Sequence, residues 1–348
     1  MADALIGALR ARKLSAVRAA VKAKPEAARH PRAILEASRL AFQQALELFH
    51  RNGADMNAAW RNYRPLHALM QEEPHAEAGQ PAPERLACLD WLLEHGANPE
   101  QLGAWPPARA IIIAAFAGQP EYVTRLRKAG AKLDGFAAAA LGDRKLVEKA
   151  LRERPQLARE RDHGGLTALQ CAAGSRMPGA VSVEIARILI DAGADVSALT
   201  KSWAHDIDAA YLAAGNKNQR LFELLLDRGA DATEALSHAV WGGHYELAEM
   251  ALARGADPDR ATANGKPLLN DLIRWGQVKP TIWLLARGAS PNVPDADGWT
   301  SVHQAAARGN ARMIKAVLDA GGDPARRDHQ GHTPADLDKG KRLVALMS

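Results

Sequence analysis

One short phrase recurs along the chain: an apolar helical run, a basic or polar residue, and then Gly-Ala-Asp or a close relative. Its copies begin at Gly53, Gly96, Gly130, Gly193, Gly229, Gly255, Gly288 and Gly321. The intervals between these glycines are 43, 34, 63, 36, 26, 33 and 33 residues, so the base period is near 33. A chain of 348 residues with such a period grows by adding units and does not need one large core.

The interval of 63 residues hides one unit. Between Gly130 and Gly193 an outer-helix pattern over residues 146–151 ends at Pro155 instead of at a glycine. The first unit ends in the same manner at Pro25. Proline stops a helix because it lacks the backbone N–H and clashes with the preceding turn. We therefore expect helices to end just before both prolines.

A second phrase, a turn followed by a helix start, comes next in several units. It reads Asp-x-x-Gly-x-Thr and then an apolar run, in the segments 162–169, 295–303 and 328–335, with a shortened copy at 64–68. The glycines supply the left-handed backbone that closes a helix or reverses the chain. The hydroxyl of the threonine can cap the helix that follows. The caps predicted in this way are Thr167, Thr300 and Thr333.

The period and the Thr-Pro-Leu-His-x-Ala signature together resemble the ankyrin repeat. The resemblance implies an all-α fold, an ankyrin-repeat solenoid of about ten helix-turn-helix units with short hairpin turns in a curved array. We expect a single array over residues 1–348. Its parts are an N-terminal capping unit at 1–30, central repeats at 31–327 with insertions at 71–84 and 174–182, and a C-terminal half-unit cap at 328–348.

The resemblance also implies a protein–protein interaction module that grips a protein partner with its hairpin tips and the inner helices of its concave face. Six of the eight tryptophans map to turn segments or to the ends of inner helices. Tryptophan offers a large rigid surface, although each ring can instead pack under a neighbouring hairpin. The predicted partner-binding residues are Trp241, Trp275, Trp299, Arg308, Trp203, Trp105, Trp60, Tyr63 and Lys266.

The two insertions, 71–84 and 174–182, fall at the same place in the repeat and are rich in Pro, Gly and Ala. Inserted loops on one edge of a solenoid can carry binding specificity, but surface loops also tolerate insertion at little cost. Neutral insertion is the slightly favoured interpretation.

An alternative function uses the basic N-terminus, since residues 1–57 carry ten Lys/Arg against five Asp/Glu. Such a face would attract nucleic acid, and its binding would weaken steeply with salt. The basic residues are interrupted by alanine and leucine at helical spacing, which favours a solvated helix face.

The sequence contains no recognisable catalytic motif, so no enzyme activity, cofactor or metal is expected. Cys88 and Cys171 show no metal-binding spacing, and the His-Asp-Ile-Asp run at 205–208 lacks a second ligand cluster. No membrane span or secretory leader is expected either. The chain is interpreted as a monomeric cytoplasmic protein, from a GC-rich bacterial genome by its Ala, Arg and Gly content. The roles considered are inhibitor, immunity factor and effector adaptor.

Overall fold

The structure is a computed structural model that describes residues 2–71, 81–104, 106–179, 181–201, 206–262, 265–340 and 342–347. The chain divides into two compact units, unit 1 at Met1–Ala209 and unit 2 at Ala210–Ser348. Both are built from short consecutive helices.

The described residues of unit 1 form twelve α-helices, two 3-10 helices and one pair of very short strands. Its elements are α1 (Ala2–Arg10), α2 (Leu14–Ala23), η1 (Pro25–Arg29), α3 (Pro31–Arg39), α4 (Gln43–Arg51), α5 (Pro65–Gln71), α6 (Pro83–Glu94), β1 (Leu102–Gly103), β2 (Ala108–Arg109), α7 (Ala110–Ala117), α8 (Pro120–Lys128), α9 (Gly135–Leu141), α10 (Arg144–Glu153), η2 (Pro155–Ala158), α11 (Ala168–Gly174) and α12 (Ser182–Asp191).

Where the structure describes unit 2, its elements are all helices, the first of which begins at the last residue of unit 1. Its elements are α13 (Ala209–Gly215), α14 (Gln219–Asp227), α15 (Ala232–Trp241), α16 (Tyr245–Ala253), α17 (Leu268–Arg274), α18 (Val278–Leu285), α19 (Ser301–Arg308), α20 (Ala311–Asp319), α21 (Pro334–Leu337) and α22 (Arg342–Met347).

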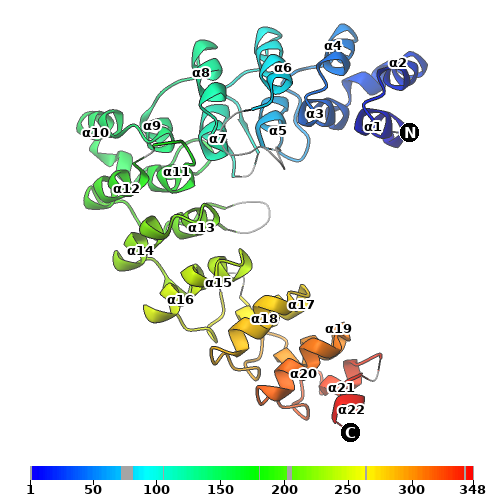
Figure 1. Ribbon diagram of the computed structural model, residues 1–348, viewed down its shortest axis with the longest axis vertical. Coiled ribbons are helices and arrows are strands. Elements are labelled where there is room, and N and C mark those ends of the chain that lie inside the picture. Colours follow the sequence, from blue (N-terminus) through cyan, green and yellow to red (C-terminus); the bar gives the residue numbers. More distant parts are fainter. Residues whose placement is uncertain are drawn as a thin grey trace. The chain divides into compact units, whose positions relative to one another are not determined.

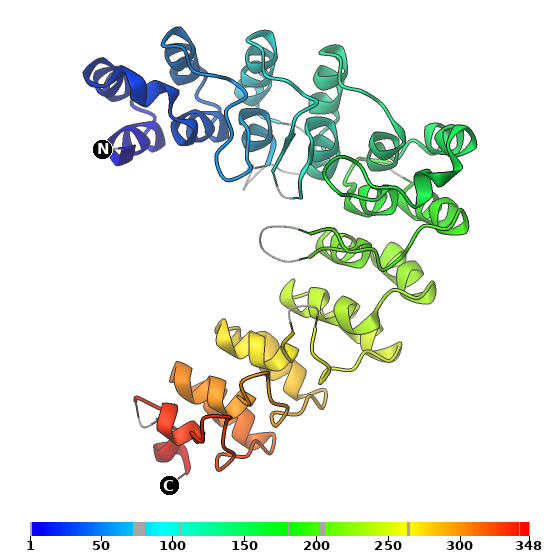
Figure 2. The same cartoon turned by 180° about the vertical axis from the view of Figure 1, so that it is seen from behind.

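Within each unit the helices form two layers (Figures 1 and 2). In unit 1 the first helices of successive pairs pack side by side, α3 on α5, α5 on α7 and α7 on α9, and the second helices form the other layer. In unit 2, α17 packs on α19 and α18 packs on α20 in the same manner. The only sheet among the described residues is the antiparallel pair of β1 and β2. The predicted all-α class and helix-turn-helix units are confirmed.

The repeated glycines end the second helix of their units as predicted. All eight have a backbone φ between +81° and +93°, the left-handed region in which a side chain is strained. The two predicted proline stops are also confirmed. Helix α2 ends at Ala23 and α10 at Glu153, and in both places the proline opens a 3-10 helix instead.

The predicted threonine caps hold the starts of first-layer helices. The amide of Gln170 donates to Thr167 Oγ1 at 3.1 Å, and the amide of Thr167 donates back to Gln170 Oε1 at 2.8 Å. Thr300 and Thr333 pair in this reciprocal manner with His303 and Asp336. Helices α11, α19 and α21 therefore begin at a fixed distance from their hairpin turns.

First-layer helices are buried over most of their surface because each packs between neighbouring first-layer helices. Helix α9 reads Gly-Phe-Ala-Ala-Ala-Ala-Leu, and its residues 135–140 are buried between α7 and α11. Small side chains allow the neighbouring helices to approach closely, which explains the alanine run. Larger side chains fill the space between the layers, for example Tyr122, Phe49 and Phe222.

Enlarging one of these alanines should therefore destabilise unit 1. We expect Ala139→Leu to lower the free energy of unfolding by about 1–3 kcal/mol, because the extra carbons have no free volume. Denaturant unfolding measures this, with Ala19→Leu on the exposed face of α2 as the control. Equal stability of the two variants would contradict close packing around α9.

Candidate functional site

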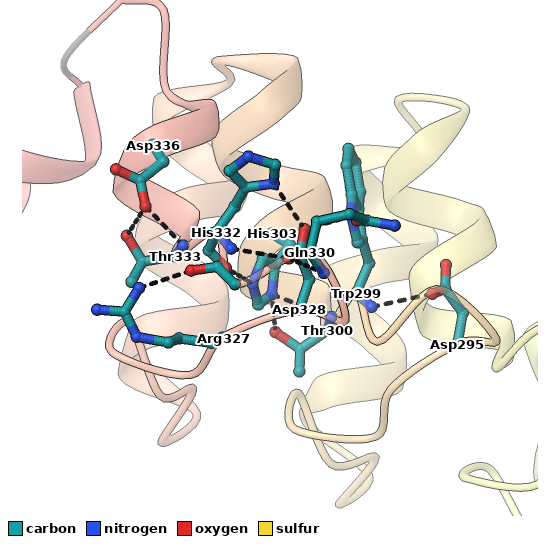
Figure 3. A network of polar contacts seen from close by, with 11 residues as sticks. Asp295, Trp299, Thr300, His303, Arg327, Asp328, Gln330, His332, Thr333 and Asp336 are labelled. Atoms are coloured by element: carbon teal, nitrogen blue, oxygen red, sulfur yellow. Dashed lines mark hydrogen bonds and ion pairs between the residues drawn. The ribbon is translucent and has the colours of Figure 1, made fainter.

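The end of unit 2 at which the hairpins lead into the first-layer helices is called the hairpin end. There the last two hairpins are joined by a network of polar contacts (Figure 3). The half-buried Trp299 donates its indole N–H to Asp328 Oδ2 at 3.0 Å, across to the next hairpin. Asp328 Oδ1 also accepts from the amides of Gln330 and His332, at 2.9 and 2.8 Å. Hydrogen bonds to these backbone N–H groups lower the pKa of Asp328, against the opposing effect of desolvation. The network thus fixes one hairpin against the next.

The histidines of the Thr-Pro-Leu-His signature are structural. His303 Nε2 bonds the carbonyl of His332 at 3.2 Å, and His67 Nε2 bonds the carbonyl of Ala108 at 3.0 Å. Each ring therefore links the start of a first-layer helix to the following hairpin. Burial lowers the pKa of both histidines, that of His67 to about 4, so both rings are neutral near pH 7.

Among the described tryptophans, the two most exposed lie at the opposite end of the first-layer helices. Trp241 ends α15 with 39% of its surface exposed, and Trp275 follows the last residue of α17 with 64% exposed. Each precedes the glycine-containing turn that leads to the second helix of its pair. A tryptophan ring offers a large rigid apolar surface, so the exposed ring of Trp275 is a candidate contact for a partner.

Arg308 lies directly against the turn of Trp275. Its Nη1 donates to the carbonyl of Arg274 at 2.6 Å. Gly276 has a φ of +76°, and a β-carbon there would overlap with the Arg308 guanidinium. The absence of a side chain at Gly276 therefore lets the cation lie against the turn that carries Trp275.

The structure brings Trp275 and Arg308 together but sets Trp299 apart from them. Trp299 precedes the first turn of α19, whereas Arg308 is its last residue. Eight helical residues span about 12 Å along the axis. The three predicted residues therefore belong to two ends of the unit, the hairpin end with Trp299 and the turn end with Trp275.

Sequence reasoning missed a cationic cleft that shares Arg308 with the turn of Trp275. It is a shallow depression lined by Arg308, Gly309, Asn310, Ala311, Arg312 and Arg342. Arg342 donates through Nη1 to the carbonyl of Gly309, as Arg308 does to that of Arg274. The repeat period was the available signal, since Trp275, Arg308 and Arg342 are spaced by 33 and 34 residues.

Other predicted site residues are less informative. Trp60 is 37% exposed and packs on His30, with ring centroids 5.3 Å apart, while its backbone bridges to Tyr63. Lys266 is half-buried in the hairpin before α17, where its carbonyl accepts from Thr262. Trp105 and Trp203 lie outside the described residues.

The two insertions differ in how much of them is described. Residues 72–80 of the first lie outside the described part of the chain. The second insertion connects α11 to α12 and packs on the end of α7, where the amide of Arg176 donates to the carbonyl of Ala115 at 3.0 Å. This segment of the second insertion is therefore held against its own unit.

The tryptophans of the second-layer helices pack against neighbours. Trp283 on α18 stacks on Tyr245 of α16, with ring centroids 5.1 Å apart, and Arg287 lies 4.0 Å from the centre of its ring. Trp91 on α6 stacks on His95 at 4.1 Å. These two rings stabilise contacts within one helix pair or between neighbouring helix pairs. They therefore serve as controls for the exposed tryptophans.

Several cations of the basic N-terminus are engaged with the next unit of the repeat. Arg10 bonds Glu36 at 2.7 Å, Arg12 donates to the carbonyl of Leu40, and Arg29 donates to that of Asn52 at 2.8 Å. Some of the basic residues at the N-terminus therefore stabilise the packing of one repeat on the next.

Within the described ranges, no three His, Cys, Asp or Glu side chains gather in a manner that could hold a metal ion. His205 of the His-Asp-Ile-Asp run falls outside those ranges. A search of the same residues for membrane spans found no helix with the necessary length and apolar character.

Comparison with known families gives two matches. A model described as "Ankyrin repeats (many copies)" matches residues 282–318, and one described as "Ankyrin repeat" matches residues 164–201. The chain is also 35% identical over 101 residues to ankyrin repeat and SOCS box protein 3 of Bos taurus. That match covers 29% of this chain and 19% of the relative, so the chain spans about a fifth of the relative's length.

Two solved structures resemble the fold. The ankyrin repeat domain of Bcl-3 is 24% identical with a TM-score of 0.50, over 62% of this chain and 98% of that one. The ankyrin repeat domain of human ASB11 is 24% identical with a TM-score of 0.46, over 62% of this chain and 97% of that one.

Proposed function

Because this chain is an ankyrin-repeat protein, we propose that it is a protein–protein interaction module whose partner is gripped at the turn end of unit 2, around Trp275. The observation that carries this proposal is the 64% exposure of Trp275. A ring that stabilises its own fold is covered, as Trp283 is by Tyr245 and Arg287. An exposed ring on a turn that also holds an arginine has the properties of an interface anchor.

Trp241 and Arg308 extend the proposed surface on either side of Trp275. Trp241 belongs to the preceding helix pair and Arg308 to the following one. Trp299 and Lys266 are secondary contacts in this proposal because both lie at the hairpin end. The proposal extends to unit 1 through Trp60 and Tyr63, and it keeps Trp105 and Trp203, which lie outside the described residues.

We propose that such a module acts as an inhibitor, an immunity factor or an effector adaptor. The identity of the partner decides among these roles. The test is affinity capture from the native host, with the wild-type chain and a Trp241→Ala/Trp275→Ala double variant used in parallel. We expect a protein that the wild type retains and the double variant loses. Equal recovery by both chains would contradict a binding site at the turn end.

A further inference from the structure

The cleft beside Trp275 points to the chemistry of the partner. Resting on the proposed function, we propose that the cationic cleft of Arg308, Arg312 and Arg342 binds an acidic segment of the protein partner, with Trp275 contacting an apolar side chain next to it. The cleft lies at the start of α20, and the Trp275 turn borders it through Arg308.

The three arginines are exposed, and none forms an ion pair with a carboxylate in the part of the chain that the structure describes. The hydrogen bonds from Arg308 and Arg342 go to the carbonyls of Arg274 and Gly309. A guanidinium has five N–H donors, so these bonds orient the groups and leave further donors for an anion.

Two other arginines of unit 2, Arg254 and Arg287, are paired with carboxylates within the fold. Arg254, the residue that follows α16, pairs with Glu223 at 2.9 Å and Asp227 at 2.8 Å, both on α14. Arg287 pairs with Glu249. Those cations are neutralised within the fold, whereas the three cations of the cleft remain available to a partner.

The local backbone adds to the positive potential. Helix α20 begins at Ala311, and its first turn faces the cleft with Asn310 as the cap. Unpaired N–H groups at a helix start favour a negative charge. Asp338 is the described carboxylate that lies nearest to Arg342 along the sequence. It is buried and accepts a hydrogen bond from the amide of Leu343 at 2.6 Å.

The charge of unit 2 favours a short acidic segment over a nucleic acid. Lys and Arg nearly balance Asp and Glu over residues 210–348, so the cleft is a local concentration of positive charge. A nucleic-acid surface needs cations along the whole path of the phosphate backbone. An acidic segment with a few carboxylates beside one apolar residue is complementary in charge and polarity to three guanidinium groups and one indole ring.

Fluorescence anisotropy with the full chain tests this inference, using a labelled glutamate-rich peptide that contains one leucine. Its glutamine-for-glutamate version, a labelled single-stranded DNA and inorganic phosphate as competitor are the comparison probes. We expect the acidic peptide to bind, the glutamine peptide not to bind, and Arg312→Glu to weaken the affinity at least about fivefold. Trp275→Ala should weaken it as well.

The matched control is Arg187→Glu, the same charge change at an exposed position of α12 in unit 1. Equal weakening by this control, tighter binding of DNA than of the peptide, or no binding of the peptide would each overturn the inference. Displacement by phosphate at millimolar concentration would indicate an adventitious ion site only, and it would also overturn the inference. If Arg312→Glu proves unfolded by circular dichroism, Arg312→Gln replaces it.

The failure of this inference differs from the failure of the proposed function. A captured partner that is lost on Trp275→Ala but retained on Arg312→Glu would leave the function intact and contradict an acidic segment. A partner retained by both variants would contradict the function itself.

Discussion

Acidification from pH 7 to pH 4 is expected to lower the free energy of unfolding by about 3 kcal/mol through His67 alone. Burial lowers the pKa of this ring to about 4, against about 6.5 in an unfolded chain. Between those two values the unfolded chain binds the additional proton, so stability falls as the pH falls. Above about pH 6.5 the contribution is fully present.

The surroundings of His67 explain why the charged form is excluded. The ring has no exposed surface, and Arg64 adds a repulsive positive charge. Gly103 of β1 lies so close that a β-carbon there would be 2.6 Å from His67 Nδ1. Protonation would therefore place a charge on Nδ1, which has no hydrogen-bond partner among the described residues.

Denaturant unfolding at a series of pH values from 7 to 4 measures the effect, and His67→Gln serves as the comparison. Glutamine can still donate to the carbonyl of Ala108, but it does not titrate. The difference in stability between wild type and variant should shrink or reverse as the pH falls. Parallel pH profiles for the two proteins would show that His67 is not the group responsible.

Much of the fold could be predicted from the sequence because its signals are local. The glycine of each Gly-Ala-Asp phrase needs a left-handed backbone, and the prolines at 25 and 155 cannot continue a helix. The threonine caps act within three residues of their own position. Each of these signals depends on the chemistry of a few adjacent residues, so no knowledge of the neighbouring units was needed.

The candidate site was harder to predict because it depends on contacts between units. The sequence places Trp283 on a second-layer helix but does not reveal that Tyr245 and Arg287 cover it. It places Arg308 near the end of an inner helix but does not reveal that its guanidinium crosses to Gly276. The basic N-terminus drew attention by composition, although Glu36 on another helix pairs with Arg10.

Trp275→Ala is expected to weaken binding of the captured partner by about 2 kcal/mol or more, while the melting temperature changes little. The ring is 64% exposed, so its removal leaves no cavity in the core. Trp241→Ala should act in the same direction with a smaller effect, because 39% of that side chain is exposed.

The most direct test of the account measures two quantities, melting temperature and partner affinity, for Trp275→Ala and for the control Trp283→Ala. Trp283 is stacked on Tyr245 and covered by Arg287, so its loss should lower the melting temperature and leave the affinity of the folded protein unchanged. The account predicts opposite patterns for the two variants. Unchanged affinity in well-folded Trp275→Ala would contradict a partner-binding site at the turn end of unit 2.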